Sequence, residues 1–119
     1  MSIDSLSGKT ISIDFDGVIH AYRRGWHDGT IYDVPIYWAK EAIKGLRDAG
    51  FKIAVHTARE DLFAVRDWLK KYDIEVELVS NRKQPSLVYI DDRGLRFTDW
   101  DNTLGQLATI IGKEVLEVE

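Results

Sequence analysis

Short apolar runs rich in β-branched residues alternate with helical segments along this chain, and this alternation limits its fold more than any other feature. Strands are predicted at residues 10–15, 51–55, 75–79 and 86–90, with a short fifth strand at 95–97. Helices are predicted from 39 to about 49, from about 61 to 72, and from about 101 onward, where Asp101 and Asn102 are good caps. Strands joined through helices pair in parallel. The sequence therefore predicts an α/β, three-layer Rossmann-like fold with a short central parallel sheet and helices on both faces.

The chain is expected to form a single domain over residues 1–119. Half of this length would be too short to bury a useful core, and 45% of the residues are apolar, which suits a packed interior. Residues 18–35 follow neither a strand nor a helix pattern, and they contain Asp28-Gly29, a hairpin-turn signal. We therefore expect a small β-flap at about 18–35 and no separate cap domain.

Composition limits the partners and the location of the chain. The net charge of −4 argues against stable non-specific binding of nucleic acid, which depends on many Lys and Arg side chains. The absence of cysteine excludes disulfides and thiolate metal ligands. No apolar run approaches the ~20 residues that a membrane span needs, and residues 1–9 are too short and polar for a signal sequence. We expect a cytoplasmic protein without a membrane partner, and the oligomeric state stays open.

Two pairs of acidic residues close two of the predicted strands. Asp14 and Asp16 end the first strand, and a spacing of two points both side chains the same way on extended backbone. Asp91 and Asp92 close the fourth strand, so all four meet at one rim if these strands are neighbours. Oxygen ligands suit a hard cation such as Mg²⁺. One such acid alone fits a solvated turn residue better, but the two pairs together predict a magnesium site.

Three further residues near strand ends suit a phosphoryl group. Thr57 follows the second strand and can offer its hydroxyl and backbone N–H, although a helix cap explains it equally well. Arg59 can add a bidentate contact two residues later. Lys83 precedes the fourth strand, and there it could stabilise the charge that develops in phosphoryl transfer. Read alone, Lys83 fits a solvated surface lysine.

The order of these residues resembles the four motifs of the haloacid dehalogenase (HAD) superfamily of phosphotransferases: Asp14-Phe15-Asp16-Gly17-Val18, Thr57, Lys83 and Ile90-Asp91-Asp92. The resemblance spans roughly residues 10–100. The stretches DFDGV, HTARE and IDDRG look especially like the phosphatase domain of polynucleotide kinase–phosphatases and like small virus-encoded HAD proteins. One departure is the short spacing between Lys83 and Asp91, which indicates that the usual helix between those motifs is missing or reduced.

The resemblance implies a magnesium-dependent phosphohydrolase that acts on a phosphomonoester through an aspartyl-phosphate intermediate. Asp14 would be the nucleophile, and Asp16 would protonate the leaving oxygen and then deprotonate the attacking water. Gly17 would permit a tight turn whose backbone N–H groups point at the phosphate. The binding roles that the resemblance implies are phosphoryl binding by Thr57 and Lys83, and Mg²⁺ binding by Asp14, the backbone carbonyl of Asp16 and one or both of Asp91 and Asp92.

The resemblance also indicates a cap-less member with an open site, because only about twenty residues separate Gly17 from the first helix. The substrate would be a small phosphorylated molecule or the phosphate end of a nucleic acid. Arg23, Arg24 and Trp26 in the flap suit such a substrate, since cations and aromatic rings bind phosphates and bases. An equally good explanation is that the flap aromatics simply pack on the body. Neither flap histidine has a metal-ligand partner at useful spacing.

Three other functions fit less well. A response-regulator receiver domain has a similar sheet, but its adjacent acid pair ends the first strand, whereas here that pair comes late. A P-loop kinase needs Gly-x-x-x-x-Gly-Lys-Ser/Thr, which does not occur. The remaining alternative is a catalytically idle HAD-like module for phosphate binding or interaction, although every motif position holds a competent residue.

Overall fold

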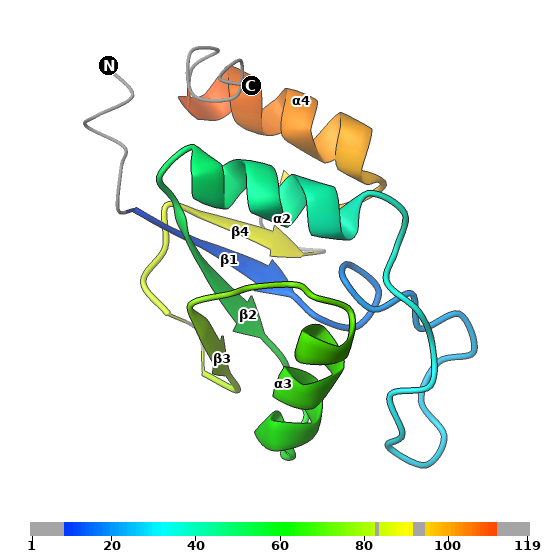
Figure 1. The fold of residues 1–119 in the computed structure, drawn as a ribbon. Helices are drawn as coiled ribbons and strands as arrows, with labels where there is room; N and C mark the ends of the chain where they lie inside the picture. The colour runs from blue at the N-terminus through cyan, green and yellow to red at the C-terminus, as the bar shows by residue number, and fades with distance from the viewer. Residues whose placement is uncertain (1–8, 83, 92–94, 112–119) are drawn as a thin grey trace.

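The computed structural model describes residues 9–82, 84–91 and 95–111, and these form a parallel sheet flanked by three helices (Figure 1). The sheet order is β3-β2-β1-β4-β5. The strands are β1 (Thr10–Asp14), β2 (Lys52–His56), β3 (Leu78–Ser80), β4 (Val88–Asp91) and β5 (Leu95–Arg96). The helices are α2 (Ala39–Asp48), α3 (Leu62–Lys71) and α4 (Trp100–Ile111). All strand pairs are parallel, so the predicted Rossmann-like α/β class is confirmed.

Strand β1 lies at the centre of the sheet and of the core. It pairs with β2 through Ile13 and Val55, and with β4 through Ile13 and Ile90. All three side chains are fully buried, as expected for the apolar runs of a parallel sheet covered by helices. The two outer strands extend this sheet on either side, so β1 is the middle strand of the sheet.

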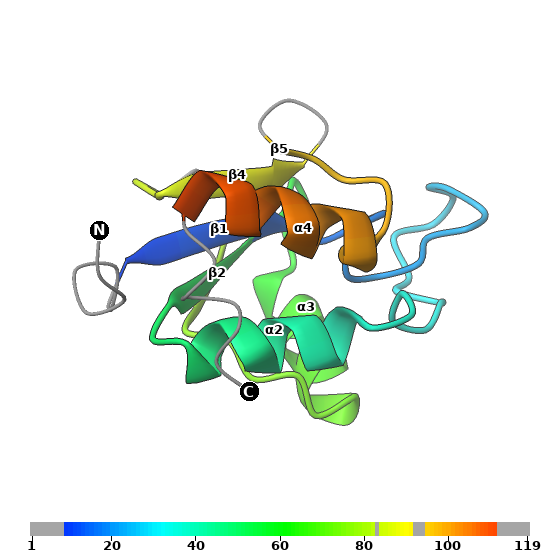
Figure 2. The same ribbon diagram turned by 90° about the horizontal axis from the view of Figure 1, so that it is seen from above.

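The helices cover the sheet as their apolar spacing predicts. Figure 2 shows α2 and α3 on the same side of β1 and β2, and α4 packs on α2 and β5. Helix α3 begins after Asp61, whose Oδ1 accepts a hydrogen bond from the Ala64 N–H at 3.0 Å. No helix among the described residues has the length and apolarity to cross a membrane.

The last helix begins earlier than predicted. We expected Asp101 or Asn102 to cap it, but Asp99 does so, because its Oδ1 accepts a hydrogen bond from the Asn102 N–H at 2.7 Å. Trp100, the first helical residue, is buried against Phe97. Burial of this ring accompanies a helix that starts one residue before Asp101.

The third strand is shorter than predicted and begins at Leu78 instead of residue 75. Glu77 lies just before it, and its Oε1 accepts the Ile53 N–H at 2.8 Å. Arg47 holds Glu77 and Glu75 by ion pairs. The Glu77 N–H still donates to the Ile53 carbonyl at 2.9 Å, but the Ile53 N–H bonds the Glu77 side chain and not a backbone carbonyl, so the regular ladder does not extend to residue 75. In its described residues, 81, 82 and 84–87, the connection to β4 contains no helix, as the short motif spacing predicted.

The flap at 18–35 does not form the predicted β-hairpin. Asp28 does make a turn, since its Oδ1 accepts the Thr30 N–H, but no strand flanks it among the described residues. The base of the flap closes through an isolated antiparallel bridge between His20 and Pro35. Two backbone hydrogen bonds flank this bridge, from the Ala21 N–H to the Val34 carbonyl at 2.9 Å and from the Ile36 N–H to the Ile19 carbonyl at 2.8 Å. The flap lies beyond the arrowheads of β1 and β4 in Figure 1.

Candidate active site

The carboxyl ends of three adjacent strands bring three predicted site residues to one edge of the sheet. Asp14 ends β1, Asp91 ends β4, and Thr57 directly follows β2. Since β1 lies between β2 and β4, Asp14 stands between the other two positions. Ligands of open α/β sheets bind at this edge. Lys83 and Asp92, the other two residues predicted here, lie outside the described residues.

Thr57 is buried and oriented by its neighbours. Its backbone N–H donates to the Ser80 carbonyl at 3.0 Å, which extends the pairing of β2 with β3. Its Oγ1 accepts the Arg59 N–H at 3.0 Å. The hydroxyl hydrogen therefore remains available for a further acceptor, which is compatible with the predicted contact to a phosphoryl oxygen.

Asp16 lies two residues beyond β1, and both of its carboxylate oxygens are engaged. Arg59 Nε donates to Oδ2 at 2.9 Å, and Arg59 Nη2 donates to Oδ1 at 3.0 Å. His20 Nδ1 lies 2.8 Å from Oδ1. Sequence reasoning assigned Arg59 to the substrate phosphate, whereas in the structure its guanidinium holds Asp16. A third donor, Arg59 Nη1, binds the Gly29 carbonyl of the flap at 2.7 Å.

His20 is a site residue that sequence reasoning missed. It is fully buried, and its ring packs on Phe15 and Trp68. A tight turn brings it to Asp16, because Gly17 has φ +84° and its N–H donates to the His20 carbonyl at 2.8 Å. The Gly17 N–H is therefore hydrogen-bonded within the turn, whereas the sequence predicted that N–H groups of this turn would point at the phosphate. The signal in the sequence was the spacing of four between Asp16 and His20 across a glycine turn.

The three predicted substrate contacts of the flap have different surroundings. Arg23 pairs with Asp33, and its N–H and Nε both donate to Asp33 Oδ2. These hydrogen bonds hold the pKa of the Asp33 carboxyl well below its usual range. Arg24 lies over the ring of Tyr32, 4.4 Å from its centroid. Trp26 is 63% exposed, and the Arg59 guanidinium lies 5.3 Å from its ring.

A pocket of about 710 Å³ lies between the flap and the start of α3, directly beside Asp16. Of the three flap residues predicted to bind substrate, only Trp26 lines it. Other lining residues are Tyr22, Gly29, Ile31, Arg59, Glu60 and Asp61. The pocket therefore offers aromatic walls next to the carboxylate that was predicted to protonate the leaving group.

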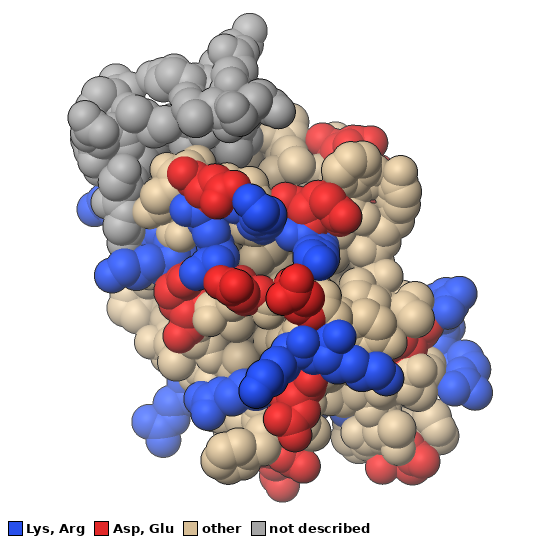
Figure 3. Space-filling model, viewed as in Figure 1, with Lys and Arg blue, Asp and Glu red and all other residues tan. Residues whose placement is uncertain are grey.

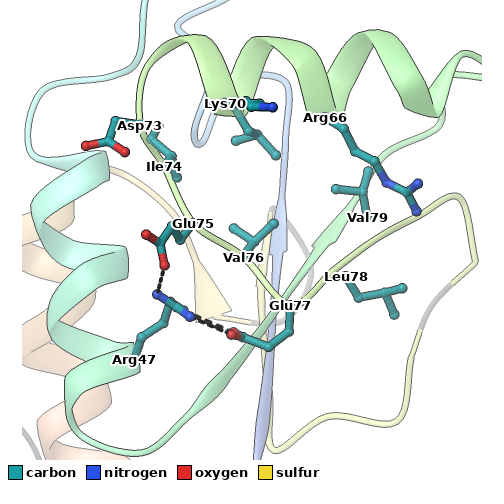
Figure 4. Close-up of a pocket in the computed structure, with 11 residues that line it drawn as sticks. Arg47, Arg66, Lys70, Asp73, Ile74, Glu75, Val76, Glu77, Leu78 and Val79 are labelled. Atoms are coloured by element: carbon teal, nitrogen blue, oxygen red, sulfur yellow. Dashed lines mark hydrogen bonds and ion pairs between the residues drawn. The ribbon is translucent and has the colours of Figure 1, made fainter.

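A second pocket, of about 500 Å³, lies near the end of α3 and the start of β3, away from the carboxyl ends of the strands (Figure 4). Figure 4 shows Arg47 between Glu75 and Glu77, with both ion pairs drawn. On the face in Figure 3, acidic and basic side chains lie interleaved and form no single-sign surface. Neither feature adds a group to the site at the strand ends.

The donor set at the sheet edge fits a magnesium ion. Asp14 and Asp91 end neighbouring strands, and Mg²⁺ typically takes one or two carboxylates with waters and phosphate oxygens. Within residues 9–82, 84–91 and 95–111, no group of three or more histidine or acidic side chains is placed to hold a metal ion. Asp92 lies outside those residues, so the fit rests on two carboxylates.

Comparisons with known proteins support the fold. No family model matches the sequence, and no curated protein matches it. A solved structure of a conserved Bacteroides thetaiotaomicron protein superposes with a TM-score of 0.66 and 20% identity, over 95% of this chain and all of that one. A structure of a Pnkp1/Rnl/Hen1 complex superposes with a TM-score of 0.53 and 19% identity. This match covers 91% of this chain and 36% of that one.

A second structure, of the Pnkp1/Rnl/Hen1 RNA repair complex, gives a TM-score of 0.52 and 17% identity, over 93% of this chain and 34% of that chain. The chain therefore spans about a third of the two repair-complex chains that it matches. At these identities the likeness establishes a shared fold, which is the α/β fold described above.

Proposed function

We propose that this protein is a Mg²⁺-dependent phosphohydrolase of the HAD type, which cleaves a phosphomonoester through an aspartyl phosphate on Asp14. The observation that carries the proposal is the position of Asp14 on the central strand, between Thr57 and Asp91. Asp16, two residues further on, is held in place by Arg59 and His20. Structural likeness to chains of an RNA repair complex supports a role in processing nucleic-acid ends.

The proposed reaction has two steps. An Asp14 carboxylate oxygen attacks phosphorus, the bond to the ester oxygen breaks, and Asp16 gives that oxygen its proton. Asp16 then takes a proton from water as the water oxygen attacks phosphorus, which releases inorganic phosphate and restores Asp14. Thr57 and Lys83 orient the phosphoryl oxygens. Asp14, the Asp16 carbonyl and one or both of Asp91 and Asp92 would hold Mg²⁺, which would supply positive charge to neutralise the phosphate.

Mg²⁺ is expected to support hydrolysis of 4-nitrophenyl phosphate and to raise the melting temperature, because it binds only the native state. At a Mg²⁺ concentration a hundredfold above its dissociation constant, the free energy of unfolding rises by about 2.7 kcal/mol. Asp91→Asn should lose most of this shift. Asp48→Asn, an exposed acid on α2 paired with Lys44, is the matched control and should keep it. Full activity in EDTA, or an unchanged shift in Asp91→Asn, contradicts the proposed metal site.

Trp26→Ala is expected to raise KM for a nucleoside monophosphate and for a phosphorylated oligonucleotide about tenfold, because stacking of a base on an aromatic ring is lost. The value of kcat should change little, since stacking is binding energy shared by the ground state and the transition state. Tyr37→Ala, which removes an exposed ring that does not line the pocket beside Asp16, is the control. Equal KM values for wild type and Trp26→Ala would mean that the pocket holds no base.

The alternative, an idle module that binds phosphate, predicts a different result in the same assays. Such a protein would show the Mg²⁺-dependent thermal shift without releasing phosphate from any substrate. Release of phosphate from a nucleotide or an oligonucleotide with a 3′- or 5′-phosphate excludes this alternative.

A further inference from the structure

We propose that His20 is a positioning residue for Asp16, and that the flap residue Asp33 fixes the tautomer in which His20 does so. This inference rests on the proposed function, because Asp16 is the acid of that reaction. It concerns a side chain that no motif of the sequence pointed to.

The two ring nitrogens of His20 have different partners, and these partners define the tautomer. The Asp33 backbone N–H donates to Nε2 at 3.1 Å, so Nε2 carries no hydrogen. Nδ1 therefore carries the ring hydrogen and donates it to Asp16 Oδ1 at 2.8 Å. In the other tautomer both contacts would fail, since two hydrogens would meet at Nε2 and two acceptors would meet at Nδ1.

The ring cannot turn away from these partners. His20 is fully buried, and the Phe15 ring stacks on it at a centroid distance of 5.4 Å and an angle of 19°. Trp68 lies at 5.5 Å with its ring nearly perpendicular. A polar ring in such a place has to satisfy both nitrogens within the protein, because no water replaces a lost partner. The packing thus fixes the direction of the Nδ1–H donor.

Asp33 is itself held from both ends. Its carboxylate accepts hydrogen bonds from Arg23, and its carbonyl accepts the Trp68 Nε1–H at 3.0 Å. The peptide N–H of Asp33 is therefore directed at His20 by contacts on either side. Because Trp68 belongs to α3, these contacts link the flap, the helix and the His20 ring.

The consequence for Asp16 is an unequal pair of carboxylate oxygens. Oδ1 accepts two hydrogen bonds, from His20 Nδ1 and Arg59 Nη2, whereas Oδ2 accepts one, from Arg59 Nε. The oxygen with fewer donors is the one that can carry the catalytic proton. In the first step Oδ2 gives this proton to the leaving oxygen, and in the second step it takes one from water. His20 keeps Oδ1 as an acceptor throughout and so orients Oδ2.

The kinetic test compares two substrates that need the acid to different extents. β-Glycerol phosphate releases a poor alkoxide leaving group, and 4-nitrophenyl phosphate releases a stable phenolate. His20→Phe should lower kcat/KM for β-glycerol phosphate about tenfold, a part of what general acid catalysis contributes. It should change kcat/KM for 4-nitrophenyl phosphate little, because kcat/KM reports the first step and not the hydrolysis of the aspartyl phosphate that both substrates share. His20→Asn, whose amide N–H takes the place of Nδ1–H, should restore most of the loss. Equal losses on both substrates, or no rescue by Asn, overturn the positioning role.

A second measurement reads the tautomer on the wild-type protein and without turnover. Long-range ¹H–¹⁵N NMR spectra of the wild type report which nitrogen of each histidine is protonated, and His20→Asn identifies the His20 signals among the three histidines. We expect a protonated Nδ1 and an unprotonated Nε2. A protonated Nε2 overturns the inference whatever the enzyme does. Wild-type protein that hydrolyses neither substrate contradicts the proposed function, and the positioning role with it, while the NMR result still decides the tautomer.

Discussion

Asp14→Asn protein is expected to fold normally and to lose at least about a thousandfold in the rate of phosphate release. The loss follows from chemistry, because an amide oxygen does not attack phosphorus as a carboxylate does. The fold should persist, because Asp14 Oδ1 accepts the Phe15 N–H at 3.0 Å and an asparagine Oδ1 can accept the same bond. Rates on 4-nitrophenyl phosphate and thermal melts of the same samples measure both effects.

The control for this variant is again Asp48→Asn, which makes the same chemical change on an exposed helix position. Mass spectrometry of the wild type, quenched during turnover, should locate the phosphoryl group on the peptide that contains Asp14. Folded Asp14→Asn protein with normal turnover, or a phosphoryl group trapped on another side chain, contradicts Asp14 as the nucleophile.

The positions of Asp14, Thr57 and Asp91 could be predicted from the sequence because each closes or follows a short apolar strand. The alternation of strands and helices determines a parallel sheet, and a parallel sheet gathers the carboxyl ends of its strands at one edge. Residues at those ends therefore lie at the same edge of the sheet, independently of how the loops fold. The order β3-β2-β1-β4-β5 then places Asp14 in the middle.

The contacts of Asp16 could not be predicted in the same way. Arg59 lies 43 residues from Asp16 in the sequence, and its guanidinium was free to point at substrate or at protein. His20 and Asp33 meet because the flap folds over buried aromatic rings and not through a regular hairpin. Loop paths depend on such side-chain packing, which has no sequence period. The start of β3 was misplaced for a related reason, since the Glu77 side chain accepts the Ile53 N–H where a regular strand would offer a backbone carbonyl.

Arg59→Met is expected to lower the free energy of unfolding by about 2–3 kcal/mol, because it leaves the partly buried Asp16 carboxylate without its cation. Arg59 is 8% exposed, and the change also removes the hydrogen bond to the Gly29 carbonyl of the flap. Asp16→Asn removes the charge that Arg59 neutralises. The double variant should be less destabilised than the sum of the two single variants, with a coupling energy of about 1–3 kcal/mol. Urea denaturation of the four proteins, without Mg²⁺, measures it.

The matched control is a second cycle on Arg47 and Glu77, a bidentate pair on the other side of the fold from the sheet edge. Arg47 and Glu77 side chains are 31% and 35% exposed, so water screens this pair more, and its coupling should be smaller than that of Arg59 and Asp16.

The Arg59→Met and Asp16→Asn variants also separate two roles of Arg59. If Arg59 acts only by holding the Asp16 carboxylate, then adding Arg59→Met to the Asp16→Asn protein should lower its activity little further. If Arg59 binds the substrate phosphate directly, as its place in the sequence suggested, the second change raises KM further in the Asp16→Asn background.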